Sequence, residues 1–193
     1  MTLGGADARV MVMSAVATSV RPLRRVEYDR LVSAGVFESE RVELIDGTVM
    51  TMAPHGPEHD GTLQILAKLL ARAVGERADV RVQSAFAAAE DAEPEPDLAL
   101  VPPGDYRDAH PNVASLVVEV AVSSQLHDRR KAAVYARAGV TEYWIVDVPR
   151  GVIERHLAPS DMGYEQKSTL RRGESIAPHA FPDAVIAIDT ILR

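Results

Sequence analysis

Two acidic residues occur in stretches that otherwise have the composition of buried β-strands. Asp97 immediately precedes the apolar run 98–101, and Glu119 lies within the run 116–120. Short runs rich in Val and Leu are typical of strands that are buried on both faces. Because an ionised carboxylate buried without a partner costs several kcal/mol, each acid is expected to be paired, hydrogen-bonded at a strand end or bound to a metal. If the strands are neighbours, Asp97 and Glu119 converge at one end of the sheet. They then supply two carboxylate ligands, the smallest set that holds Mg²⁺, and the other coordination positions of the ion are filled by water and phosphate.

The overall composition fits one globular domain. The chain has 193 residues, of which 47% are hydrophobic, and we assign residues 21–193 to a single domain with a proper core. There is no cysteine, which excludes a disulfide framework, a zinc–thiolate site and a cysteine nucleophile, and which fits a reducing cytoplasm. The formal charge of -7 argues against a broad basic surface that coats nucleic acid, but it leaves a local, metal-mediated contact with phosphate open.

Residues 1–20 precede this domain and contain the apolar segments 10–13 and 15–17. They lack a basic n-region and are too short to span a bilayer, so we expect no membrane association. We interpret them as a tail that is either flexible or docked in a dimer. Together with late strands that could leave an exposed sheet edge, this tail leads us to expect a homodimer.

The pattern of apolar residues predicts helices interspersed with strands. Helices are expected where apolar residues recur at helical spacing and a glycine follows, and strands where short apolar or alternating runs occur. A tight hairpin is expected over 41–52, around Asp46-Gly47. The expected helices cover 26–34, 58–74 and 127–138, the last starting near Ser123 and Ser124, and the further expected strands cover 79–85, 97–101, 116–120, 142–147, 152–157 and, more weakly, 164–170 and 185–188. Segments 87–95 and 102–111 are expected to be exposed turns. This order predicts an α/β sandwich in which helices flank a mixed central sheet.

Four side chains are ambiguous when judged from the residues alone. Glu43 lies in the hairpin, where alternation does not decide its face, and an exposed position is favoured. His59 lies in the first turn of a helix, where it could meet phosphate, but contact with water is favoured. Lys131 shares one helical stripe with Asp128 and Tyr135, yet it could be a plain surface lysine. Tyr135 is interpreted as a core aromatic without a chemical role.

Four sequence motifs occur in a characteristic order and spacing: 42–47, 95–100, 117–120 and 135–147. Together they resemble the Uma2 family of restriction-endonuclease-like proteins, in the family's order and at near-family spacing. The resemblance extends from about Arg24 to the C-terminus. It implies the PD-(D/E)xK nuclease superfamily and hence an α-β-β-β-α-β core, which is a restriction-endonuclease-like mixed sheet flanked by helices with a metal at one end.

The resemblance also implies a set of site residues and an activity. Glu43, Asp97 and Glu119 would form the acidic set, and the backbone carbonyl of Val120 would add a metal oxygen. This set would hold one or two Mg²⁺ ions, or Mn²⁺, that polarise a phosphodiester and lower the pKa of a bound water. Lys131 would orient or deprotonate that water and neutralise developing charge. The implied function is a metal-dependent endonuclease that hydrolyses phosphodiester bonds of nucleic acid, with DNA as the expected substrate.

Three features depart from the family pattern and keep a second function open. Ala121 stands two residues after Glu119, where the superfamily usually has a lysine, so the resemblance moves that role to Lys131. The step from Asp128 to Lys131 is one residue shorter than usual, which rotates one of the two side chains by about 100° around the helix. Val122 stands where many relatives have an acid. The alternative function is that of a catalytically degenerate protein of the same fold that acts as a nucleic-acid-binding or scaffold homodimer.

Overall fold

The structure is a computed structural model that describes residues 19–122 and 125–192, and only the backbone of residues 125–130. The expected tail over residues 1–20 lies outside the described residues except for its last two positions. Ser123 and Ser124, the expected start of a helix, also lie outside them.

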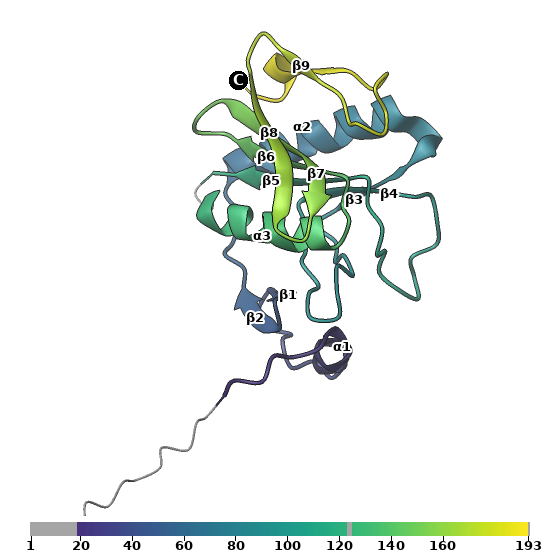
Figure 1. The fold of residues 1–193 in the computed structure, drawn as a ribbon, viewed down its shortest axis with the longest axis vertical. Coiled ribbons are helices and arrows are strands. Elements are labelled where there is room, and N and C mark those ends of the chain that lie inside the picture. The colour runs from purple at the N-terminus through teal and green to yellow at the C-terminus, as the bar shows by residue number, and fades with distance from the viewer. Residues whose placement is uncertain (1–18, 123–124, 193) are drawn as a thin grey trace, which may run out of the picture.

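A six-stranded mixed sheet forms the centre of the fold (Figure 1). Its strands follow the order β3-β4-β5-β6-β7-β8, and each neighbouring pair is antiparallel except β5 and β6. These strands are β3 (Asp79–Val82), β4 (Leu98–Val101), β5 (Leu116–Ala121), β6 (Glu142–Asp147), β7 (Val152–Ser160) and β8 (Gly163–Arg171). β4, β5 and β6 are buried along their whole length, as expected for apolar runs in the middle of a covered sheet. The predicted α/β class with a mixed central sheet is confirmed.

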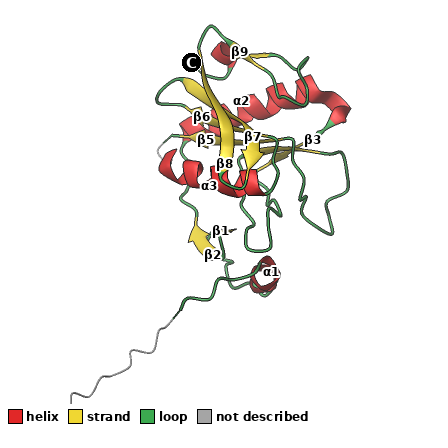
Figure 2. Ribbon diagram, viewed as in Figure 1, coloured by secondary structure: helices red, strands yellow, loops and turns green. Residues whose placement is uncertain are grey.

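Two helices pack on the two faces of this sheet (Figure 2). α2 (Pro57–Val74) contributes its apolar stripe to one core cluster, and α3 (Gln125–Arg137) contributes to the other. Side chains of β5 alternate between these clusters: residues 116, 118 and 120 belong to the α2 side, and residues 117 and 121 belong to the α3 side. Since Glu119 has the same parity as Val117 and Ala121, it faces α3.

The hairpin around Asp46-Gly47 forms as predicted, but it stands apart from the central sheet. β1 (Val42–Ile45) and β2 (Thr48–Thr51) pair antiparallel as a two-stranded sheet of their own. Asp46 and Gly47 have φ angles of 47° and 71°, as a type I′ turn requires. Figure 1 shows the hairpin and α1 (Arg25–Ser33) on one side of the central sheet.

Segment 87–95 is not the exposed turn that its polarity suggested. Ala92, Glu93 and Pro94 are buried. Leu44 and Glu93 exchange two backbone hydrogen bonds, of 3.2 and 2.8 Å, so this segment fastens the hairpin to the strand that begins at Leu98. The expectation failed because the acids and small residues here meet a distant segment of the chain, which local polarity does not reveal. In contrast, residues 102–110 are mostly exposed, as predicted.

The C-terminal segment covers the α2 side of the core. Here β9 (Ser175–Ile176) pairs antiparallel with β10 (Ile186–Ala187), and the 3-10 helix η2 (Ile188–Thr190) follows, whereas the other 3-10 helix, η1 (Gly75–Arg77), directly follows α2. The expected strand at 185–188 is therefore shorter than predicted. β8, which leads directly into this segment, is a largely exposed edge strand. Such an edge motivates the expected homodimer, which stays a prediction.

Replacing Gly47 with Ala is expected to destabilise the protein by about 1–2 kcal/mol or more. The positive φ at this position costs roughly that amount for a residue with a Cβ, and the new methyl group would also collide with Pro22. Gly61 is the matched control because a Cβ there meets nothing within 4 Å, and Ala in a helix interior is favoured by roughly 0.5–1 kcal/mol over Gly. Urea unfolding of the two variants checks this, and equal stability of both would contradict it.

Candidate active site

The acidic residues singled out from the sequence meet in one cavity at an end of the central sheet. The cavity has a volume of about 330 Å³, and part of its wall is the segment 50–56, which leads from β2 to α2. The structure brings together around it every residue of the expected set, namely Glu43, Asp97, Glu119, Val120 and Lys131, and adds His59.

Asp97 and Glu119 are adjacent because of the register between β4 and β5. Leu98 pairs with Val118, so the residue before Leu98 lies beside the residue after Val118. The Asp97 N–H donates to Glu119 Oε2 at 3.3 Å, and the Val120 N–H donates to Asp97 Oδ2 at 2.8 Å. Both carboxylates are buried. The two acids thus lie at the same end of the sheet.

Lys131 bridges two of the acids from α3. Its Nζ lies 2.9 Å from Glu43 Oε2 and 2.9 Å from Glu119 Oε1, and the side chain is only 3% exposed. Burial alone would lower the pKa of Lys131, but the charges of Glu119 and Glu43 outweigh it and raise the pKa above the usual lysine value. The side chain is therefore a buried ammonium, and the alternative of a plain surface lysine is wrong.

Glu43 is buried as well, so the exposed position favoured from the sequence is wrong. Its Oε2 accepts a hydrogen bond from the Glu95 N–H at 3.1 Å, in addition to the contact with Lys131. Glu43 and Leu44 are consecutive and both buried, which means that both faces of β1 are covered. Alternation within the hairpin could not reveal this because the covering groups come from segment 92–95 and from α3.

His59 belongs to the site too, contrary to the preference for water contact. Its Nε2 lies 3.0 Å from Asp97 Oδ2, and its Nδ1 lies 3.1 Å from Asp60 Oδ1. Burial by itself would lower the pKa of His59, but the hydrogen bond and charge of Asp97, with Asp60, raise it. Burial would likewise raise the pKa of Asp97, but the hydrogen bonds from His59 and the Val120 N–H lower it, so this carboxylate is ionised at neutral pH.

A sequence model of one protein family, described as "Putative restriction endonuclease", matches residues 25–189. The family is Uma2, and the chain belongs to it. The match runs from the start of α1 into η2, and it contains every side chain of the cavity described above. The resemblance noted from the sequence segments is thereby confirmed.

A solved structure shares the fold of this Uma2 chain. It is the crystal structure of "a putative nuclease belonging to DUF820" from Anabaena variabilis ATCC 29413, with a TM-score of 0.69 and 14% sequence identity, covering 88% of this chain and 97% of that chain. At this identity the likeness concerns the fold alone. No curated protein matches the sequence. Within the described residues, no helix is both long and apolar enough to cross a membrane.

Tyr135 is a site residue of this Uma2 chain that the sequence reasoning missed. Its hydroxyl donates to Glu119 Oε1 at 2.7 Å, the oxygen that also contacts Lys131. Burial and the charge of Glu119 raise the pKa of Tyr135 well above its usual value, so it remains a hydrogen-bond donor. The shared helical stripe of Lys131 and Tyr135, four residues apart, was the available signal, but Tyr135 was interpreted as a core aromatic all the same. For His59 the missed signal was similar, since the apolar stripe of α2 begins four residues after it, at Leu63.

Two of the positions that depart from the family pattern lie beside the acids. Ala121 is fully buried on the α3 side of β5, the side that Glu119 faces, and Val122 lines the cavity. Lys131 reaches Glu119 from α3, so an ammonium is present although Ala121 replaces the usual strand lysine. The side chain of Asp128 lies outside the described part of the chain, and its expected position on the helical stripe stays a prediction.

The donor set of this site fits a hard divalent cation. Three buried carboxylates, those of Glu43, Asp97 and Glu119, line one cavity together with the Lys131 ammonium, which contacts Glu43 and Glu119. Oδ1 of Asp97 accepts no hydrogen bond from the described residues, because His59 and the Val120 N–H both use Oδ2. Carboxylate oxygens are the ligands that Mg²⁺ and Mn²⁺ prefer.

Proposed function

We propose that this Uma2 protein is a metal-dependent endonuclease that hydrolyses phosphodiester bonds of nucleic acid, with DNA as the expected substrate. The observation that carries the proposal is the convergence of three buried carboxylates and one buried ammonium on a single cavity. Burying charges costs several kcal/mol per ion before pairing offsets it. Clusters of ionisable groups with shifted pKa values in a cleft are typical of functional sites. The family description points to the same class of reaction.

Asp97, Glu119 and the backbone carbonyl of Val120 would hold the metal ion, Mg²⁺ or Mn²⁺. When bound, the ion would supply positive charge next to the scissile phosphate and a water of lowered pKa. Glu43 has a different task in this proposal. Its Oε2 is shared between Lys131 and the Glu95 N–H, so it holds the ammonium in place beside Glu119.

Lys131 is suited to orienting water and stabilising charge. Its raised pKa keeps it protonated at neutral pH, and a protonated amine cannot accept a proton. A fixed ammonium can instead donate a hydrogen bond to a phosphate oxygen or to a water, and it offsets negative charge that develops in the transition state. The resemblance implied that Lys131 orients or deprotonates the water and neutralises developing charge. We assign it orientation of the water and charge stabilisation, and not deprotonation.

Mg²⁺ is expected to raise the thermal unfolding temperature and to be required for DNA cleavage. A ligand that binds only the folded state stabilises it by about 2.7 kcal/mol at one hundred times its dissociation constant. For a chain of this size that corresponds to a rise of roughly 5–10 °C. Thermal unfolding in Mg²⁺, in Mn²⁺ and in Na⁺ at equal ionic strength measures the shift, and single- and double-stranded DNA serve as cleavage substrates.

The variant Glu119→Gln provides the control for this experiment because it removes one charged ligand with little change of shape. It should lose both the shift and the cleavage. If the unmodified protein binds DNA but shows neither a shift nor cleavage, the nuclease proposal is wrong and the degenerate binding or scaffold protein takes its place.

A further inference from the structure

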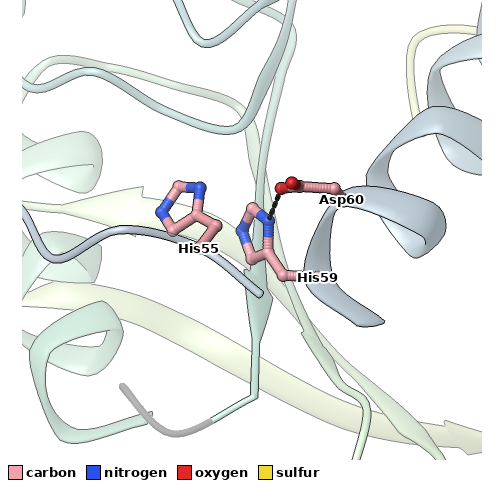
Figure 3. Close-up of side chains that lie close together, drawn as sticks. All are labelled: His55, His59 and Asp60. Atoms are coloured by element: carbon pink, nitrogen blue, oxygen red, sulfur yellow. Dashed lines mark hydrogen bonds and ion pairs between the residues drawn. The ribbon is translucent and has the colours of Figure 1, made fainter. Parts of the chain in front are cut away.

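A second cluster of metal-ligating side chains lies beside the acidic set. His55, His59 and Asp60 each offer a ligand atom, and these atoms lie within 4.8 Å of one another. Figure 3 shows the three side chains grouped where the chain enters α2: His59 and Asp60 come from the first turn of the helix, and His55 comes from the segment before it. The rings of His55 and His59 are tilted by 32° to each other, with centroids 3.8 Å apart.

The ligand types in this cluster differ from those of the acidic set. Two imidazoles and one carboxylate suit zinc and neighbouring first-row transition metals, and three protein ligands leave a fourth position open. The acidic set, in contrast, offers only oxygen, which suits Mg²⁺. The two clusters therefore suit different ions, although Asp97 of the acidic set also contacts His59 of the second cluster.

The hydrogen bond between His59 and Asp97 favours metal binding by the other ring nitrogen. A metal-bound histidine usually donates its second N–H to a carboxylate, which fixes the ring and its tautomer. Here Nε2 of His59 lies 3.0 Å from Asp97 Oδ2, while Nδ1 is directed at Asp60, a prospective co-ligand. The buried His59 ring is thus held with Nδ1 toward the cluster.

The other two ligands have room to close around an ion. Ligand atoms around a tetrahedral zinc lie roughly 3.3 Å apart, given zinc–ligand distances of about 2.0–2.2 Å, so the cluster must contract by about 1–1.5 Å. The Asp60 side chain is 62% exposed and can move. Nδ1 of His55 lies 3.0 Å from the Gln83 side-chain amide. The Gln83 atom at this distance is the amide nitrogen, which donates to Nδ1 and leaves the His55 proton on Nε2. Turning the amide over, so that its oxygen faces Nδ1, moves the proton to Nδ1 and makes Nε2 the ligand.

We propose that His55, His59 and Asp60 form a second metal site, specific for a transition metal of the zinc class and separate from the acidic set. The site does not depend on the proposed nuclease activity, since none of its ligands belongs to the set that would hold Mg²⁺. It is coupled to that set through Asp97, whose Oδ2 contacts His59 and whose Oδ1 would be left to hold the other cation in the proposed function.

The test is a titration of Zn²⁺ and Co²⁺ into tag-free, chelator-treated full-length protein in the presence of excess Mg²⁺. We expect one Zn²⁺ per chain by equilibrium dialysis, and a visible Co²⁺ absorption band that Zn²⁺ removes. His55→Ala and Asp60→Asn should each weaken Zn²⁺ binding roughly tenfold or more. His110→Ala is the matched control, because it removes a histidine that lies outside the cluster.

A second measurement needs no variant, in case a substitution disturbs folding. Co²⁺ in the site should broaden the imidazole NMR signals of His55 and His59 while it leaves that of His179 sharp. Zinc binding that excess Mg²⁺ abolishes, that survives in the His55→Ala/Asp60→Asn double variant, or that is absent would overturn the proposal. In any of these cases His59 is simply a structural partner of Asp97.

Discussion

Replacing Asp97 with Asn is expected to abolish Mg²⁺-dependent cleavage of DNA, with a loss of roughly 10³-fold or more. A metal ion contributes several kcal/mol of charge stabilisation, and each 1.4 kcal/mol corresponds to about tenfold in rate. The amide keeps the shape of the carboxylate and can still accept the Val120 N–H through its oxygen. The loss should therefore be one of metal affinity and not of fold, which cleavage assays and unfolding curves of the same preparation can distinguish.

Asp108→Asn is the control for this substitution because Asp108 lies in the exposed segment after β4, away from the cavity. It should cleave DNA like the unmodified protein. Cleavage that survives in Asp97→Asn at the original rate would mean that the activity comes from another site or from a contaminating nuclease, and the assignment of the acidic set would have to be abandoned.

Replacing Lys131 with Ala is expected to reduce the free energy of unfolding by about 3–5 kcal/mol, the usual cost of removing one partner from a buried ion pair. Glu43 and Glu119 would lose the ammonium that they share. Cleavage should fall by about 10²–10⁴, as is typical for a positioned charged group. Lys68→Ala is the control, since Lys68 is exposed on α2 and its loss should change stability by less than about 0.5 kcal/mol.

The pH dependence separates an electrostatic loss in Lys131→Ala from a packing defect. In the unmodified protein the raised pKa of Lys131 means that its pairing stabilises the fold fully below the unfolded lysine value, about 10.4, and that this stabilisation is lost as the pH rises through the folded pKa. In Lys131→Ala the two acids should have raised pKa values. The destabilisation that these two buried carboxylates cause should then be absent below about pH 4.3, the unfolded glutamate value. It should grow as the pH rises. A destabilisation that is the same at pH 4 and at pH 8 would instead indicate a cavity.

The sequence was sufficient for the parts of the molecule in which local pattern and tertiary packing agree. The helix over 58–74 and the strand over 142–147 were predicted nearly to the residue, because their apolar periodicity reflects the burial that they have in the fold. Asp97 and Glu119 were found from residue type alone, since a carboxylate in an apolar strand requires a partner.

The sequence was insufficient where burial comes from a distant segment. Glu43 and His59 were both assigned to the surface, yet Glu95, Lys131 and Asp97 enclose them, and these partners are 38 to 88 positions away in the sequence. Lys131 itself entered the site through family resemblance, since its helix carries no local signal that its ammonium is buried. The strands β7 and β8 extend further than expected because their pairing with each other, and not an apolar pattern, defines their length.

The candidate site is built from two parts of the fold, the separate β1–β2 hairpin and the six-stranded sheet, and the hairpin is held by fewer contacts. β1 and β2 pair with each other, and their described contacts with the rest of the fold include the bridge between Leu44 and Glu93 and an ion pair from Asp46 to Arg137 on α3. Asp97 and Glu119, in contrast, are embedded in the six-stranded sheet. We therefore expect the hairpin to open as a local cooperative unit at a lower free energy than global unfolding, which amide hydrogen exchange of β1 and β2 would measure. Such opening would withdraw Glu43 from Lys131 and move aside the β2 wall of the cavity, while Asp97 and Glu119 stay in register in the sheet. A polymer chain could then enter the cavity from the side instead of threading through a fixed aperture.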